Sequence, residues 1–148
     1  MTDSKLIDSS VWLSYFFNGD YREIIESDDV LYLSALSVFE IRKKLWKEKI
    51  ESAKIMKCMG YLTKRSLILD VTTEIADTAV AISIENQLAA VDALIYTTAL
   101  LHDAVLITKD NDFRGLKRVN IFKLLEQSNL KNLTVRKHGS ILWLRWSA

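Results

Sequence analysis

The fold is decided by residues 88–116, which read LAAVDALIYTTALLHDAVLITKDNDFRGL. Between residues 92 and 102 apolar side chains recur every three or four positions, a spacing that predicts a helix. The short apolar run at residues 105–108 predicts a buried strand, and it leads into a loop with two acids, Asp110 and Asp112. A helix followed by a buried strand is the repeating unit of an α/β fold.

The same alternation runs through the rest of the chain. Further buried strands are predicted at residues 6–7, 30–33, 67–71 and 119–122, and further helices at residues 36–49, 53–65 and 73–87. This order predicts an α/β fold with a parallel sheet. With 148 residues, of which 49% are hydrophobic, the chain can bury one core without the help of a disulfide or a zinc ion.

Residue usage also predicts the compartment. Cys58 is the single cysteine, so a disulfide framework is not available, and this fits a reducing cytoplasm. No apolar run approaches the roughly 20 residues that span a bilayer, and Met1 leads into a polar stretch rather than the apolar core of a signal peptide. We therefore expect a soluble, cytoplasmic protein that has no contact with a membrane.

The charge distribution separates the carboxyl-terminal segment from the rest. The net charge is +1, but four of the 20 basic residues and none of the 19 acidic residues fall after Gln127. We expect one domain at residues 1–125 and a basic, apolar extension at residues 126–148. Residues 133–137 and 140–146 could pair as a hairpin around His138 and Gly139. Packing on the core, support of a dimer and contact with a partner all remain open for this extension.

Acids and hydroxyls recur after the predicted strands, where the working sites of open α/β sheets lie. Asp8 and Ser10 follow the first strand, and Asp110 follows Thr108 at the end of the fourth. Each acid also has a simpler explanation. Asp8 can cap a helix, and Asp110 can stabilise a turn. Asp92 can also cap a helix, but it interrupts an apolar stretch in which a charge needs a partner.

The predicted helix at residues 36–49 carries Glu40 and a basic run. Lys43 and Lys44 follow Glu40 at the spacing of ordinary exposed helix pairs, which favours a surface position for the acid. The basic run is typical of a solvated helix face, although it could also follow a phosphate backbone. It comprises Arg42, Lys43, Lys44, Lys47 and Lys49.

Several aromatic and apolar residues recur at helical spacing. We predict that they belong to the core, with base stacking as the alternative. They are Trp12, Phe16, Phe17, Leu45 and Trp46.

Four stretches of the chain, in this order and spacing, resemble PIN domains, and VapC-type toxins in particular. They are LIDSSVWLSYF (6–16), LSALSVFEIRKKL (33–45), LAAVDALIYTTAL (88–100) and LITKDNDFRGL (106–116). The resemblance implies a three-layer α/β/α fold whose central parallel sheet has the strand order 3-2-1-4-5. The first and fourth strands are neighbours in that order. Adjacent strands lie about 4.8 Å apart, so Asp8 and Asp110 could converge on one point.

The resemblance also implies roles for individual residues and partners. The catalytic and metal-binding quartet would be Asp8, Glu40, Asp92 and Asp110. Asp112 would be an accessory acid, and Ser10 and Thr108 would hydrogen-bond the carboxylates. The substrate would be RNA, cut to leave a 5′-phosphate and a 3′-hydroxyl. The protein would be a homodimer, with a cognate antitoxin that blocks the site.

Elementary electrostatics favours a cation at such a cluster. Two carboxylates about 4 Å apart repel each other by about 4 kcal/mol at an effective dielectric constant of about 20. A hard divalent cation with oxygen ligands removes that repulsion, and the expected cofactor is Mg²⁺ or Mn²⁺. A bound metal can activate water and stabilise the charge that develops on phosphorus, so the expected reaction is phosphodiester hydrolysis.

Other functions are open at this point. An aspartyl-phosphate phosphatase would need a second acid where the chain has Ser10, which disfavours that class. A PIN-like module could bind RNA or protein without catalysis, although the presence of all four acids disfavours it. An RNA-processing nuclease that is not a toxin would have the same residues.

Overall fold

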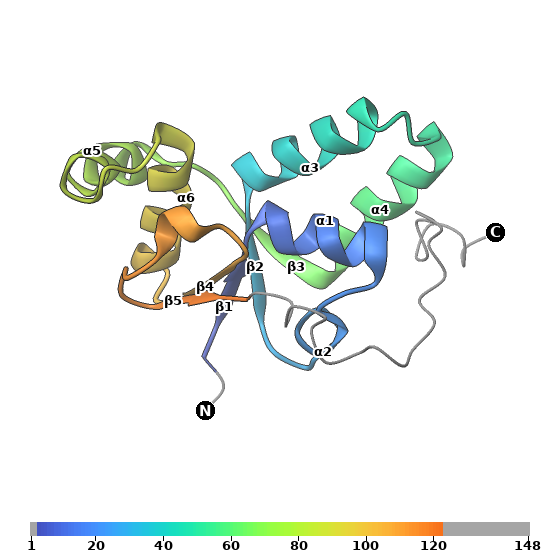
Figure 1. The fold of residues 1–148 in the computed structure, drawn as a ribbon, viewed down its shortest axis with the longest axis horizontal. Coiled ribbons are helices and arrows are strands. Elements are labelled where there is room, and N and C mark those ends of the chain that lie inside the picture. Colours follow the sequence, from blue (N-terminus) through green and yellow to red (C-terminus); the bar gives the residue numbers. More distant parts are fainter. Residues whose placement is uncertain (1–2, 123–148) are drawn as a thin grey trace, which may run out of the picture.

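A computed structural model of the chain describes residues 3–122. Five strands form one parallel sheet in the order β3-β2-β1-β4-β5 (Figure 1). They are β1 (Lys5–Ile7), β2 (Leu31–Ser34), β3 (Ser66–Leu69), β4 (Val105–Thr108) and β5 (Val119–Ile121). The α/β class and the strand order expected from the sequence are confirmed.

Six α-helices and one 3₁₀ turn connect the strands in the described part of the chain. They are α1 (Ser9–Asn18), α2 (Arg22–Ile25), α3 (Ala35–Lys47), α4 (Ser52–Arg65), α5 (Thr73–Asn86), α6 (Ala90–Leu101) and η1 (Asn111–Phe113). The four helices predicted from periodicity occur with ends that differ by at most two residues. The short helix α2 was not predicted, because four residues are too few to display a helical period.

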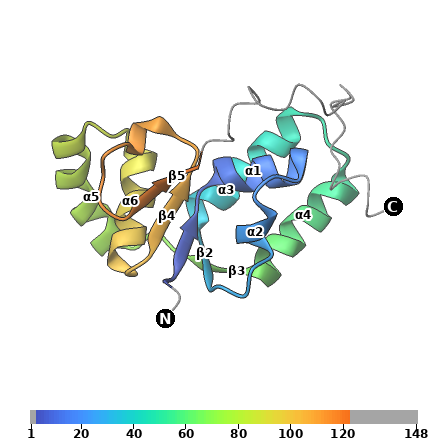
Figure 2. The same ribbon diagram turned by 60° about the horizontal axis from the view of Figure 1, so that its bottom comes forward.

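The sheet separates two hydrophobic cores, because successive side chains of a strand point to opposite faces. On one face Ile7, Leu33 and Ile107 pack against α1, α3 and α4. On the other face Leu6 and Leu106 pack against α5 and α6. Figure 2 shows α1 to α4 on one side of the strands and α5 with α6 on the other. The fold is therefore a three-layer α/β/α arrangement, as expected.

The strand order reverses between β1 and β4. The chain runs outward from β1 through β2 to β3 and then returns to β4 on the other side of β1. Ile7 is paired with Ile107, and the Asp8 amide donates to the Ile107 carbonyl at 2.9 Å. Ligands of open α/β sheets bind beyond the carboxyl ends of the strands at such a reversal. The residues that follow β1 and β4 therefore lie where such a fold binds its ligand.

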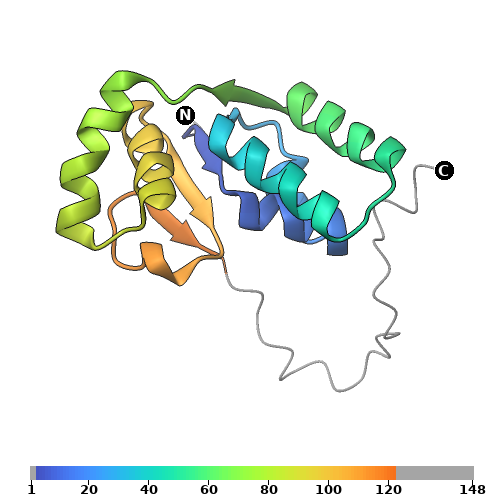
Figure 3. The same cartoon turned by 90° about the horizontal axis from the view of Figure 1, so that it is seen from above.

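Helix α3 borders this point. It contacts α1, α4 and α6, and Figure 3 shows it between α4 and α6. Its inner face is formed by Ile41 and Leu45, which lie one turn apart and are fully buried. The position of a residue around α3 thus decides whether its side chain faces the core, the carboxyl end of β1 or solvent.

Two sequence expectations about burial are wrong. Trp46 was expected in the core, but it is 68% exposed, because it lies about 100° around α3 from the buried Leu45. Strand β3 was expected to be buried, but Leu67 and Ile68 are 59% and 40% exposed. The reason is that β3 is an edge strand with a single neighbour, β2. Trp12, Phe16 and Leu45 are fully buried as expected, and Phe17 is partly buried.

No single helix among residues 3–122 is long and apolar enough to cross a membrane. Helices α5 and α6 meet the length and composition criteria only when they are taken together, and they are bent by 114° at their junction. The boundary expected at residue 125, the extension at residues 126–148 and its hairpin lie outside the described residues.

Candidate active site

Asp8 is a buried acid held by two hydroxyl groups. It follows β1 and is 7% exposed. Its Oδ2 accepts a hydrogen bond from Ser10 Oγ at 2.7 Å and another from Thr108 Oγ1 at 2.9 Å. It occupies the N-cap position of α1, but its side chain makes no capping bond, so the helix-cap explanation does not account for this carboxylate. Ser10 and Thr108 thus hydrogen-bond a carboxylate, and their part in catalysis stays a prediction.

The same two hydroxyls join Asp8 to the loop after β4. Thr108 Oγ1 accepts the Asp110 amide at 3.0 Å, and Ser10 Oγ accepts the Lys109 amide at 3.1 Å. Each hydroxyl therefore accepts from the β4 loop and donates to Asp8. The carboxylate of one strand and the backbone of its neighbour are fixed relative to each other before any ligand binds.

The two carboxylate oxygens of Asp110 have different surroundings. Its Oδ1 accepts the Asp112 amide at 2.9 Å and so starts the turn η1, which agrees with the turn explanation. Within residues 3–122 no hydrogen bond reaches its Oδ2. Asp92 lies in the first turn of α6, but the N-cap of that helix is Ala89, so Asp92 does not cap it. One carboxylate oxygen from each of Asp92, Asp110 and Asp112 lies within 4.8 Å of the others.

Burial and charge both act on Asp92. Burial has the largest effect, followed by the charges of Asp110, Asp8 and Asp112 in that order, and together they raise the pKa of Asp92 to about 6. In the described part of the chain none of these acids belongs to an ion pair. Asp92 therefore lacks the partner that the sequence called for, and its neighbours are carboxylates with the same charge.

Glu40 points into the site rather than standing on the surface. It is half-buried, and its Oε1 accepts a hydrogen bond from Ser9 Oγ at 3.3 Å. Burial and then the charge of Asp8 raise the Glu40 pKa, with a smaller effect from Asp92, while the Ser9 bond lowers it. The surface position favoured by the spacing to Lys44 is wrong, because that lysine pairs with Glu48 at 2.7 Å.

Lys109 is the cation nearest in sequence to these acids, yet it turns away from them. Its Nζ donates to Ser14 Oγ at 3.2 Å and lies 5.9 Å from the centre of the Tyr21 ring. Ser14 in turn donates to Asp20 at 2.8 Å. The lysine inside the acidic loop therefore leaves the acids uncompensated. Neither the contacts of Lys109 with Ser14 and Tyr21 nor the bond from Ser9 to Glu40 was predicted from the sequence.

We call these five residues the acid cluster: Asp8, Glu40, Asp92, Asp110 and Asp112. The donor set fits a hard divalent cation, since it offers carboxylate oxygens with uncompensated negative charge. The closest group differs from the expected metal quartet, however. It contains Asp112, which was expected to be accessory, and it does not include Asp8 or Glu40, which interact with Asp92 through their charges.

Residues 5–119 match the family model of the PIN domain. The chain belongs to the PIN-domain family. It is 30% identical over 118 residues to Ribonuclease VapC22 of Mycobacterium tuberculosis, covering 74% of this chain and 89% of that protein. The resemblance of the sequence to VapC-type PIN domains is thereby confirmed.

Solved structures agree with this assignment. The PIN domain described here is similar to a toxin-antitoxin complex from Klebsiella pneumoniae, with a TM-score of 0.66 and 25% identity, covering 81% of this chain and 99% of that chain. It also shares its fold with VapC20 of Mycobacterium tuberculosis, a sarcin-ricin loop cleaving toxin, with a TM-score of 0.56, 17% identity and coverage of 73% and 91%. The acid cluster thus lies in a PIN domain whose relatives include a ribonuclease.

Proposed function

We propose that this protein is a Mg²⁺- or Mn²⁺-dependent endoribonuclease that hydrolyses RNA phosphodiester bonds. The observation that carries the proposal is the group of Asp92, Asp110 and Asp112 within 4.8 Å, placed where the strand order of a PIN domain reverses. Holding three carboxylates together without a cation is unfavourable. A fold keeps such a group when an ion or a reaction uses it.

Each residue of the proposed site has a defined task. Asp92, Asp110 and Asp112 would hold the ion, with Asp8 and Glu40 as further carboxylate donors. A bound Mg²⁺ or Mn²⁺ supplies an activated water and stabilises negative charge on the phosphoryl oxygens. Ser10 and Thr108 both donate to Oδ2 of Asp8 and so fix the orientation of its carboxylate. Its other oxygen, Oδ1, would then be the ligand atom.

Glu40 is suited to move a proton. Ser9 occupies its Oε1, so Oε2 is left to accept a proton from the attacking water. In the metal-free site burial and the charge of Asp8 raise the pKa of Glu40, which makes its carboxylate a stronger base than an ordinary glutamate. By analogy with the family, the products would be a 5′-phosphate and a 3′-hydroxyl.

We further propose that the protein is the toxin of a type II toxin–antitoxin pair and acts in the cytoplasm as a homodimer. The similarity to a toxin-antitoxin complex supports a cognate antitoxin as the partner. An antitoxin would silence the enzyme by covering the acid cluster. An RNA-processing nuclease with the same chemistry would differ in having no such inhibitor.

Cleavage of labelled RNA by the full chain tests the nuclease. Single-stranded and structured RNAs are incubated with Mg²⁺, Mn²⁺ or EDTA, and wild type is compared with Asp92→Asn. The exposed Asp77→Asn on α5 is the matched control, because it removes the same charge from a helix that carries no residue of the acid cluster. We expect metal-dependent cutting that only Asp92→Asn abolishes. No cutting of any RNA, together with no heat of Mn²⁺ binding, would leave a binding module as the function.

A further inference from the structure

The outer face of α3 carries two large aromatic side chains that the core does not use. Phe39 is 64% exposed and Trp46 is 68% exposed. They lie seven residues apart, which is about two turns, so they emerge from the same side of the helix. The inner face of α3 is already complete with Ile41 and Leu45. The exposure of the two rings is therefore unrelated to packing of the fold.

Basic side chains stand between these rings. Arg42, Lys43 and Lys47 are exposed, and within residues 3–122 none of them belongs to an ion pair. Lys43 Nζ lies 5.6 Å from the centre of the Phe39 ring. We call this surface the α3 track; its members are Phe39, Arg42, Lys43, Trp46 and Lys47. Its cations are available to an anionic ligand.

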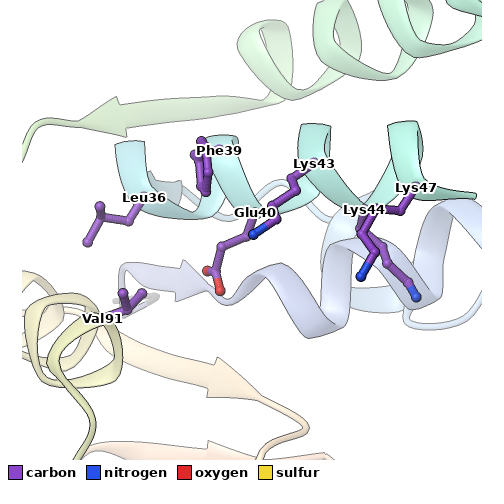
Figure 4. Close-up of a pocket in the computed structure, with 7 residues that line it drawn as sticks. All are labelled: Leu36, Phe39, Glu40, Lys43, Lys44, Lys47 and Val91. Atoms are coloured by element: carbon purple, nitrogen blue, oxygen red, sulfur yellow. The ribbon is translucent and has the colours of Figure 1, made fainter.

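The α3 track is continuous with the acid cluster. A groove of about 470 Å³ runs along α3 and is lined by Leu36, Phe39, Glu40, Lys43, Lys44, Lys47 and Val91. Figure 4 shows Glu40 in this groove, with Leu36 and Val91 at one end and Lys44 and Lys47 at the other. A second hollow of about 320 Å³ adjoins it beside Trp46. One wall of the groove thus contains both an acid of the site and lysines of the track.

We propose that the α3 track binds the single-stranded RNA flanking the bond to be cut, with bases on Phe39 and Trp46 and phosphates on Lys43 and Lys47. This rests on the function proposed above. Surfaces for single-stranded nucleic acid combine basic side chains along the backbone with aromatic platforms for the bases. From Glu40 to Lys47 the helix rises about 10 Å, so the α3 track can accompany a short stretch of RNA next to the bond to be cut.

Two other occupants fit the surface less well. The cores of protein–protein interfaces are depleted in lysine, whereas lysines line both hollows of the α3 track. A second copy of the chain would present the same basic face and be repelled. RNA supplies negative charge and flat rings together, which matches both kinds of side chain on the track.

Binding of a short labelled single-stranded RNA by the full chain tests the proposal. The Asp92→Asn background prevents cutting, and affinity is measured over a range of salt concentrations. We expect Lys43→Ala/Lys47→Ala to weaken binding about tenfold and to reduce the slope of log affinity against log salt by about 1.4, since each phosphate contact contributes about 0.7. The matched control is Lys64→Ala/Lys117→Ala, which removes two exposed lysines just before β3 and β5. They precede the amino ends of these parallel strands, whereas Asp8 and Asp110 follow the carboxyl ends of β1 and β4.

Trp46 separates stacking from charge. Trp46→Ala should weaken binding about tenfold without changing the salt slope, because a base loses its platform and no phosphate contact is removed. Trp46→Phe should keep most of the affinity. Sedimentation of the same variants, without RNA, reports whether the face instead joins two copies.

The outcomes separate this proposal from the nuclease function. Equal weakening by both lysine pairs, or by neither, overturns the α3 track even when the wild type cuts RNA. Conversion of a dimer to a monomer by Trp46→Ala, with unchanged RNA affinity, overturns it in favour of a second copy. Track-dependent binding by a wild type that cuts no RNA supports the track and overturns the nuclease.

Discussion

The acid cluster and the α3 track adjoin each other but are built in opposite ways. The acids follow strands β1 and β4 or lie half-buried on helices, and hydroxyl groups hold Asp8 in one orientation. The basic and aromatic residues of the α3 track are long, exposed side chains on one helix face. Chemistry on a phosphate requires fixed charges, whereas contact with a flexible strand tolerates side chains that adapt. The difference predicts that substitutions in the two regions change different quantities.

After Asp92→Asn, which should abolish cutting, the largest effect is expected at Asp110. Asp110→Asn keeps the amide oxygen that can accept the Asp112 amide, so η1 should persist while the charge of the site falls. We expect turnover of RNA to fall by about 100- to 1,000-fold, as when one electrostatic group of an active site is removed. The melting temperature with EDTA should not fall. A large loss of melting temperature would mean that Asp110 acts mainly in the turn.

Thr108→Val should affect both stability and turnover. The valine leaves the buried Asp8 carboxylate and the Asp110 amide each without one partner. We expect the free energy of unfolding to fall by about 1 to 3 kcal/mol, measured by urea unfolding. Metal affinity or turnover should fall by about 10- to 100-fold, as for other residues that orient ligands. Thr108→Ser should recover both quantities; failure of the serine to do so would contradict the role of the hydroxyl.

The pH dependence of stability should identify Asp92 in the metal-free protein. Its pKa is raised from 3.8 to about 6, so the folded state binds more protons than the unfolded state between these values. Stability should therefore fall as pH rises from about 4 to about 6 and then level off. Because Asp92 is only half-buried, we expect a change of about 1 kcal/mol, or about 2 to 4 °C. Asp92→Asn should flatten this part of the curve, and Mg²⁺ should oppose the loss above pH 6.

The smallest effect is expected at Lys44. It lines the same groove as Lys43 and Lys47, but its ammonium pairs with Glu48. Lys44→Ala should therefore change RNA affinity less than twofold, well below the effect of Lys43→Ala or Lys47→Ala under the same conditions. An equal loss at all three lysines would show that groove charge matters and that pairing does not.

The regular elements were predictable because the two cores impose periods on the sequence. Apolar spacing located four helices, and the sequence also indicated where β1 and β4 end, at Asp8 and beyond Thr108. The strand order itself came from the resemblance to PIN domains. What periodicity does not contain is the neighbour of a side chain across the fold. Glu40 therefore looked like a partner for Lys44, although Ser9 of α1 lies against it and Lys44 pairs elsewhere.

The exposed residues were the least predictable. Trp46 and Leu45 are adjacent and both apolar, and a count of apolar positions does not tell which one faces the core. Asp112 was expected to be an accessory acid because the resemblance to PIN domains implied that role. The bond from its amide to Asp110 curls the loop into η1 and brings its carboxylate back to Asp92.

The hydrogen bond from the Asp8 amide to the Ile107 carbonyl gives the molecule a built-in reporter. This bond joins β1 and β4 at the point where the acids of both strands meet. Amide hydrogen exchange at Asp8 thus measures how often the two strands separate there. A ligand that bridges the acids of both strands should slow exchange at this amide, whereas RNA that rests only on α3 should leave it unchanged. Exchange of the Asp8 amide proton can therefore distinguish RNA that is bound only to α3 from RNA that has reached the acid cluster.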